Sequence, residues 1–153
     1  MRPFLLIAAI AVLLDQGTKA WMTGLLRQGG IVITPFFQLI LVHNTGAAFG
    51  ILAGGETWKR ASFFAIGILA TAFLAFLYRS AATRSPFLLW GTALVSGGAT
   101  GNLVDRIRLG AVVDFLDFHL GAYHWPAFNV ADMAITVGGA CLALHFLRHP
   151  KPP

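Results

Sequence analysis

The chain has 153 residues, of which 57% are hydrophobic and 11% are charged, and its formal net charge is +5. This apolar content exceeds that of an ordinary soluble domain and indicates a single-domain membrane protein. The positive charge does not indicate nucleic-acid binding, because the basic residues are dispersed and form no cluster with interleaved aromatics. The one cysteine, Cys141, lies inside an apolar run, so we expect a buried thiol and no disulfide within the chain.

Four apolar segments approach the roughly 20 residues that a transmembrane helix requires. They are residues 3–22, 61–78, 86–104 and 130–147. The first also resembles a cleavable signal peptide, but no A-x-A-like site follows it. It runs instead into "DQGTKAW", where Asp15 and Lys19 are four residues apart and share one helix face as an ion pair. We interpret it as a retained helix with Trp21 at the membrane interface.

The distribution of charge predicts the orientation of these spans. Four spans place both termini and the second connection on one side, which carries only basic residues: Arg2, Arg79, Arg84, Arg148 and Lys151. The other side collects all the acids: Asp15, Glu56, Asp105, Asp114, Asp117 and Asp132. Because short cytoplasmic segments are enriched in Lys and Arg, the termini are predicted to be cytoplasmic and the polar residues to face outward.

Two outward segments are longer than simple connections. Residues 29–56 combine β-branched and aromatic runs with Gly and Pro, which is typical of short strands at a membrane surface. Residues 107–129 form an outer loop containing "AVVDFLDFHL". This stretch fits a strand, with Asp114 and Asp117 on opposite faces, or a short helix, with both on one face. The predicted fold is therefore an all-α polytopic membrane protein of one domain, 1–153, with four transmembrane helices and a small extracytoplasmic β-rich segment.

The third span ends in "SGGATGNLVDR", where small and polar residues recur at helical spacing: Gly97, Gly98, Gly101, Asn102, Asp105 and Arg106. The first and third of these glycines form a G-x-x-x-G pattern, which is typical of close helix packing. Small residues, Gly98 included, also make room for a substrate backbone. The three polar residues can present one face at the outer end of the helix, or Asp105 and Arg106 can form a surface pair.

The last span begins with "FNVAD", which fits a variant capping box formed by Asn129 and Asp132. Capping explains neither Asp114, in the apolar context "VVDF", nor the gathering of acids on one side. Two carboxylates that converge in a partly dry pocket share one proton, so that one can activate water while the other polarises a peptide carbonyl. The residues alone leave open which two outward Asp side chains form such a pair. They predict a carboxylate-based membrane hydrolase without a cofactor.

Other mechanisms have less support in the sequence. A serine hydrolase is less well supported because the G-x-S-x-G motif is absent. His119 and His124, near Asp117, are candidate zinc ligands, but no H-E-x-x-H occurs. A small transporter or proton conductor also uses membrane Asp and Lys residues, yet here the polar residues do not continue to the cytoplasmic ends of the spans. A presenilin-type protease requires a G-x-G-D block, which is missing.

Five motifs together resemble, in the same order, those of the bacterial lipoprotein signal peptidase family, also called signal peptidase II. They are "DQGTK", "HNTGAAFG", "GNLVDR", "VVDF" and "FNVAD". One departure is "AAFG", where Ser often follows the Phe. The resemblance covers nearly the whole chain. It implies an aspartic endopeptidase of the bacterial inner membrane that cuts prolipoproteins before a diacylglyceryl-modified Cys and is inhibited by globomycin. We also expect the protein to be a monomer.

The resemblance also implies roles for individual residues. The catalytic pair is Asp114 and Asp132. Asn102 and Arg106 contact or orient the substrate backbone, and Asn129 braces the site. The full set of supporting or substrate-binding residues expected is Asp15, Lys19, Asn44, Gly98, Asn102, Asp105, Arg106 and Asn129. The segment 29–53 corresponds to a β-rich cradle that rests on the membrane.

Overall fold

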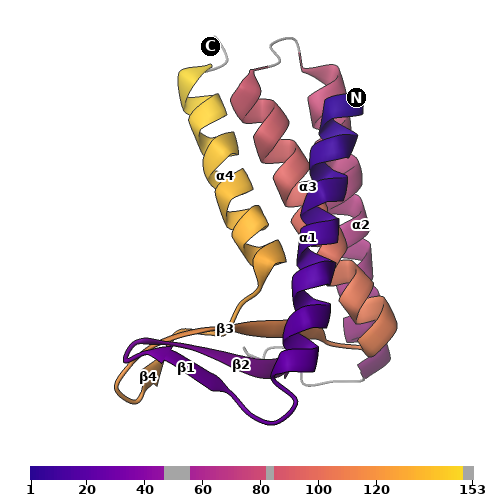
Figure 1. The fold of residues 1–153 in the computed structure, drawn as a ribbon. Helices are drawn as coiled ribbons and strands as arrows, with labels where there is room; N and C mark the ends of the chain where they lie inside the picture. The colour runs from indigo at the N-terminus through magenta and orange to yellow at the C-terminus, as the bar shows by residue number, and fades with distance from the viewer. Residues whose placement is uncertain (47–55, 82–84, 150–153) are drawn as a thin grey trace.

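The computed structural model describes residues 1–46, 56–81 and 85–149, and the side chains of these residues except 56–64. Four helices stand side by side, both chain ends lie at one end of the bundle, and a small sheet lies across the other end (Figure 1). The helices are α1 (Arg2–Leu25), α2 (Glu56–Ser80), α3 (Pro86–Leu109) and α4 (Val130–Arg148). Two of the basic residues used to predict the orientation, Arg84 and Lys151, lie outside the described residues.

By length and composition, α1, α3 and α4 can cross a membrane. The part of α2 with described side chains contributes a shorter apolar segment, Ala65–Ser80. Large apolar side chains such as Leu13 and Phe73 are mostly exposed, as expected of a surface that contacts lipid. The protein is therefore a helical membrane protein with a small antiparallel sheet, and the crossing of all four helices stays a prediction.

The ends of α3 and α4 follow from local sequence signals. Ser85 caps α3 by accepting a hydrogen bond from the Leu88 amide, and Pro86 occupies the first turn. The helix continues to Leu109, five residues beyond the predicted limit, because Gly110 supplies the left-handed cap at φ 74°. Residues 107–109, predicted to belong to the outer loop, are thus helical. At α4 the predicted capping box of Asn129 and Asp132 is confirmed.

Glycines set the close packing of α3 against its neighbours. A Cβ on Gly97 would lie 2.7 Å from the Ala11 Cβ of α1, and one on Gly101 would lie 2.5 Å from the Asp15 carboxylate, so the G-x-x-x-G pair packs against α1. A Cβ on Gly98 would collide with the Ala131 carbonyl of α4. These contacts bring α1 and α4 against neighbouring faces of the same turns of α3.

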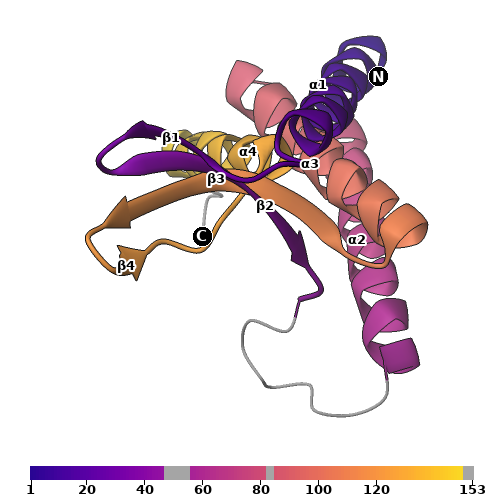
Figure 2. The ribbon, with the colours of Figure 1, turned by 60° about the horizontal axis from the view of Figure 1, so that its bottom comes forward.

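The sheet orders its strands β1 (Ile31–Thr34), β2 (Phe37–Asn44), β3 (Val112–Leu120) and β4 (Tyr123–His124), all antiparallel. The stretch that fitted either a strand or a helix is therefore a strand. Figure 2 shows β3 running from the end of α3 past the ends of α1 and α4. Phe115 of β3 is buried with Met22 of α1 and with Leu26, the residue that follows α1, and this contact fixes the sheet to the bundle. Residues 47–55 of the predicted β-rich segment lie outside the described residues.

Candidate active site

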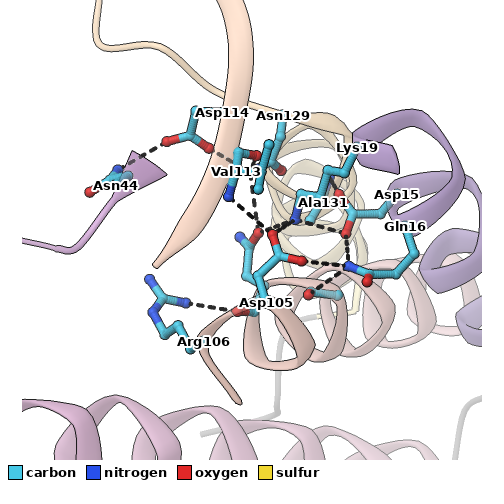
Figure 3. Close-up of polar contacts among 12 residues, drawn as sticks. Asp15, Gln16, Lys19, Asn44, Asp105, Arg106, Val113, Asp114, Asn129 and Ala131 are labelled. Carbon is cyan, nitrogen blue, oxygen red and sulfur yellow. Dashed lines mark hydrogen bonds and ion pairs between the residues drawn. The ribbon is translucent and has the colours of Figure 1, made fainter. Parts of the chain in front are cut away.

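Four Asp side chains gather where the helix bundle meets the sheet. Each comes from a different element: Asp15 from α1, Asp105 from α3, Asp114 from β3 and Asp132 from α4. Figure 3 shows Asp15, Asp105 and Asp114 within one connected set of polar contacts. Asp132 joins this set through Asn102 and Asn129. The structure thus brings together residues that the sequence distributes over more than one hundred positions.

Lys19 forms the buried centre of a charge cluster. Its Nζ lies 2.8 Å from the Asp15 carboxylate and 2.8 Å from the Asp105 carboxylate, and it donates to Asn102 Oδ1 at 2.9 Å. All three charged side chains are almost fully buried. The predicted Asp15–Lys19 ion pair is confirmed and extends to α3. Because removing one partner from such a cluster leaves an uncompensated buried charge, Lys19 is a strong stabilising element.

The two carboxylates of this cluster also bind backbone N–H groups. Asp15 accepts a hydrogen bond from the Ala131 amide at 2.9 Å, and Asp105 accepts one from the Val113 amide at 3.1 Å. Ala131 precedes Asp132 in α4, and Val113 precedes Asp114 in β3. The acids held by Lys19 therefore fix the backbone beside the other two acids.

Asn129 connects Asp114 and Asp132. Its side chain is completely buried, and its Nδ2 donates to Asp114 Oδ1 at 2.6 Å. Its side-chain Oδ1 accepts a hydrogen bond from the backbone N–H of Asp132 at 3.0 Å. The backbone N–H of Asn129 in turn donates to Asp132 Oδ2 at 3.2 Å. Asn102 donates to Asp132 Oδ1 at 2.8 Å, and Asn44 donates to Asp114 Oδ2 at 3.0 Å. The residue predicted to cap α4 thus also binds a carboxylate of the sheet.

Asp114 has an environment that favours its protonated form. Burial raises the pKa of Asp114 above its ordinary value, and the negative charge of Asp132 raises it further. Hydrogen bonds from Asn44 and Asn129 and the charge of Lys19 oppose this rise without cancelling it. Asp114 therefore holds a proton more tightly than an ordinary Asp, which is the property that a carboxylate pair needs.

Arg106 lies in the last turn of α3, beside the same acids. Its guanidinium Nη1 donates to the Asn102 carbonyl at 3.4 Å, and the side chain is half-buried (Figure 3). Electrostatic attraction links it to Asp132, Asp114 and Asp105. This position leaves a cation close to the carboxylates and next to the chain that enters β3.

Gln16 is a site residue that sequence reasoning missed. Its Nε2 donates to Asp105 Oδ1 at 2.9 Å, to the Gly101 carbonyl at 3.1 Å and to Asp15 Oδ2 at 3.1 Å. The available signal was its place in "DQGTK", directly after Asp15. Gly98 lies at the contact of α3 with the Ala131 backbone, and its expected role in supporting the site or binding substrate stays a prediction.

Asp117 belongs to a separate polar group on the sheet. Gln38 Nε2 donates to its Oδ2 at 2.6 Å, and His124 Nδ1 lies 2.8 Å from the same oxygen. Burial opposes ionisation, but these hydrogen bonds prevail and lower the pKa of Asp117. The rings of His119 and His124 stack at 5.0 Å. Within the residues that the structure describes, no group of three or more His, Cys, Asp or Glu side chains is placed to hold a metal ion.

The fold and the site define a helical membrane protein in which buried and half-buried acids from three helices and one strand meet at the end of the bundle. A family model described as signal peptidase (SPase) II matches residues 7–148. The lipoprotein signal peptidase of Paraburkholderia phymatum is 46% identical over 152 residues, which cover 99% of this chain and 91% of that protein. The lipoprotein signal peptidase of a Janthinobacterium species is 47% identical over 149 residues, covering 97% and 90% respectively.

Two solved structures share the fold. Both are described as a bacterial membrane enzyme determined by the in meso method, at 1.9 and 2.3 Å resolution. The first has a TM-score of 0.85 at 32% identity and covers 97% of this chain and 95% of that chain. The second has a TM-score of 0.81 at 32% identity and covers 100% and 94%. The chain belongs to the signal peptidase II family, and it is a peptidase.

Proposed function

We propose that this protein is an aspartic endopeptidase that removes signal peptides from bacterial prolipoproteins, with Asp114 and Asp132 as its catalytic pair. Family membership supports the substrate class, and the partners of the acids support the choice of pair. Asp15 and Asp105 each form an ion pair with Lys19, whereas Asp114 and Asp132 accept hydrogen bonds from Asn side chains. The observation that carries the proposal is that Asn129 holds both of these carboxyl groups at once.

The proposed reaction needs one ionised and one protonated carboxyl group. The raised pKa of Asp114 makes it the proposed proton donor, and the role of base is assigned to Asp132. Asp132 takes a proton from water as the water oxygen attacks the carbonyl carbon, while Asp114 donates its proton to the carbonyl oxygen. Asp132 then gives its proton to the leaving amide nitrogen, and Asp114 recovers one from the intermediate. The C–N bond breaks into an acid and an amine, and both carboxyl groups return to their starting states.

The remaining site residues would place the substrate. Arg106 and Asn102, at the outer end of α3, are the proposed contacts to the substrate backbone, and Asn44 reaches the pair from the sheet. The scissile bond would precede a diacylglyceryl-modified Cys, whose acyl chains remain in the membrane beside the helices. We further propose an inner-membrane monomer with four transmembrane helices, both termini cytoplasmic, the site near the outer face, and inhibition by globomycin.

The test compares cleavage of a diacylglyceryl-modified precursor with cleavage of its unmodified form. Wild-type protein is expected to cut only the lipid-modified precursor, and Asp114→Asn or Asp132→Asn is expected to reduce cleavage by at least 10³-fold while membrane insertion is retained. Asp117→Asn is the matched control, because it changes a buried Asp outside the proposed pair and preserves an oxygen acceptor for Gln38 and His124.

Four results would contradict the proposal. Normal turnover by either pair variant would refute the catalytic assignment, and equal cleavage of the unmodified precursor would refute the substrate class. Loss of activity on chelation would instead point to a metal near His119 and His124. Proton flux in proteoliposomes without peptidase activity would favour the alternative that the protein is a small transporter or proton conductor.

A further inference from the structure

Strand β2 carries one extra residue where it pairs with β3. Leu39 opposes Leu116, and Val42 opposes Asp114, so three steps along β2 correspond to two steps along β3. This is a β-bulge at positions 40–41. Because side chains alternate between the two faces of a strand, one extra residue exchanges the faces of everything that follows it.

Two polar pairs lie on either side of this bulge. Gln38 opposes Asp117 and donates to it at 2.6 Å, and Asn44 donates to Asp114 at 3.0 Å. Asp114 and Asp117 are three residues apart on β3 and therefore point to opposite faces. Gln38 and Asn44 are six residues apart on β2 and would share one face if that strand were regular. Both pairs can form together only because the bulge changes the alternation between them.

We infer that the β2 bulge is a positioning element of the site proposed above, and that it turns Asn44 toward Asp114. In an unbulged strand with Gln38 still opposite Asp117, Leu41 would oppose Asp114 and Asn44 would face the other side. The inference rests on the proposed function only for the consequence of this placement, which is control of the Asp114 carboxyl group.

The helices fix Asp114 independently of β2. The Val113 amide donates to Asp105 at 3.1 Å, and Asn129 donates to the Val113 carbonyl at 3.3 Å. The bulge therefore decides only what β2 presents to a carboxyl group that is already in place. Asn44 is oriented as well, because its Oδ1 accepts from the Gly46 amide at 2.9 Å and its Nδ2 is left to meet Asp114.

The part of β2 before the bulge has its own anchors. Phe37 and Phe118 pack with ring centroids 4.7 Å apart, and β1 pairs with β2 only up to Leu39. The register before the bulge is thus set by the sheet, whereas the register after it is set by the site. A change of one residue between them tests the inference directly.

Deletion of Ile40 and insertion of Ala after Ile40 are the paired test variants. Deletion gives a regular strand in which Leu41 opposes Phe115, Val42 still opposes Asp114 and Asn44 keeps its face. We expect cleavage of the lipid-modified precursor within threefold of wild type. Insertion brings His43 to the place of Asn44. We therefore expect cleavage of the lipid-modified precursor to fall at least as far as it does in Asn44→Leu, a variant that lacks the amide donor.

The insertion also has a predicted rescue. Adding His43→Asn to it returns an amide to the face of Asp114, and we expect at least a tenfold recovery of cleavage. Equal losses on deletion and insertion, full activity of the insertion variant, or failure of the rescue would each overturn the inference.

A cross-link measures the register without using activity. His43 and Val113 are directly opposed, so a cysteine at each position is within reach of a disulfide. In a Cys141→Ser background, His43→Cys with Val113→Cys is expected to cross-link in the parent and the deletion variant but not in the insertion variant. In the insertion variant Val42 opposes Val113, so Val42→Cys with Val113→Cys is expected to cross-link instead. Cross-linking that ignores the indels would overturn the inference, whereas cleavage that survives in Asp114→Asn would refute only the proposed function.

Discussion

Replacement of Asn129 separates two roles that one side chain combines. Asn129 caps α4 by accepting from the Asp132 amide, and it donates to Asp114 from the same amide group. Asn129→Ala removes both interactions. Asn129→Ser restores only the cap, because a Ser hydroxyl is a good N-cap acceptor but is too short to reach Asp114. The two variants therefore isolate the contact between α4 and the sheet.

The expected loss of stability follows from these contacts. An N-cap contributes about 1 kcal/mol. A hydrogen bond to a buried, ionisable group contributes about 1.5–3 kcal/mol. Asn129→Ala should therefore lower the free energy of unfolding by about 3 kcal/mol, and Asn129→Ser should recover about 1 kcal/mol of that loss. Thermal unfolding of the purified protein in detergent measures both differences.

Activity should not follow stability in this pair. Asn129→Ser and Asn129→Ala both lose the donor to Asp114, and a loss of about 1.5–3 kcal/mol at the reacting group slows cleavage roughly 10- to 150-fold. In the wild type the hydrogen bond from Asn129 lowers the pKa of Asp114. Its loss should therefore raise this pKa in both variants and displace the pH–rate profile toward higher pH. If Asn129→Ser recovers activity together with stability, Asn129 acts as a cap alone and the bridging argument is wrong.

Three further predictions follow from the same structure. Lys19→Met leaves two buried carboxylates without their cation and should cost about 3–5 kcal/mol in detergent unfolding, unless both acids are also replaced. Gly98→Ala should push α4 away from α3 and cost about 1–3 kcal/mol with reduced cleavage, whereas Gly17→Ala, with open space around it, should be neutral or stabilising. Because burial raises the pKa of Asp114, its contribution to stability is present below its ordinary value of 3.8 and is lost as pH rises through the raised value. Asp114→Asn should abolish this pH dependence of the free energy of unfolding, measured in detergent across the acidic and neutral range.

The helices were predictable because their signals are local. Apolar length located all four, Pro86 marked one start, and "FNVAD" marked another. The end of α3 was placed too early because hydrophobicity declines before the helix does, and Gly110 was not used as a stop signal. The strand at 112–120 could not be separated from a helix by its own pattern, because its faces are buried by partners distant in the sequence.

The sequence predicted several local features of the candidate site but not which residues contact each other across the fold. Spacing alone gave the Asp15–Lys19 pair, which is confirmed, and the capping box at Asn129. Spacing could not pair Asn44 with Asp114, because the two residues are seventy positions apart and their contact depends on a bulge in β2. Nor could it assign Gln16, whose three acceptors come from two helices. Register and tertiary contact decide these positions, and neither leaves a periodic signal.

The contacts of Lys19 explain how the proposed catalytic pair, Asp114 and Asp132, can lie beside two further acids, Asp15 and Asp105. Lys19 forms an ion pair with each of two carboxylates, and each of these carboxylates also accepts a hydrogen bond from one backbone N–H. Those N–H groups belong to the residues directly before Asp114 and Asp132. Asp15 and Asp105 are thereby held as acceptors of an ammonium and of backbone N–H groups, which suits them to positioning. One buried ammonium thus secures the backbone of both proposed catalytic residues, and the proton is left to the two acids that Asn129 connects.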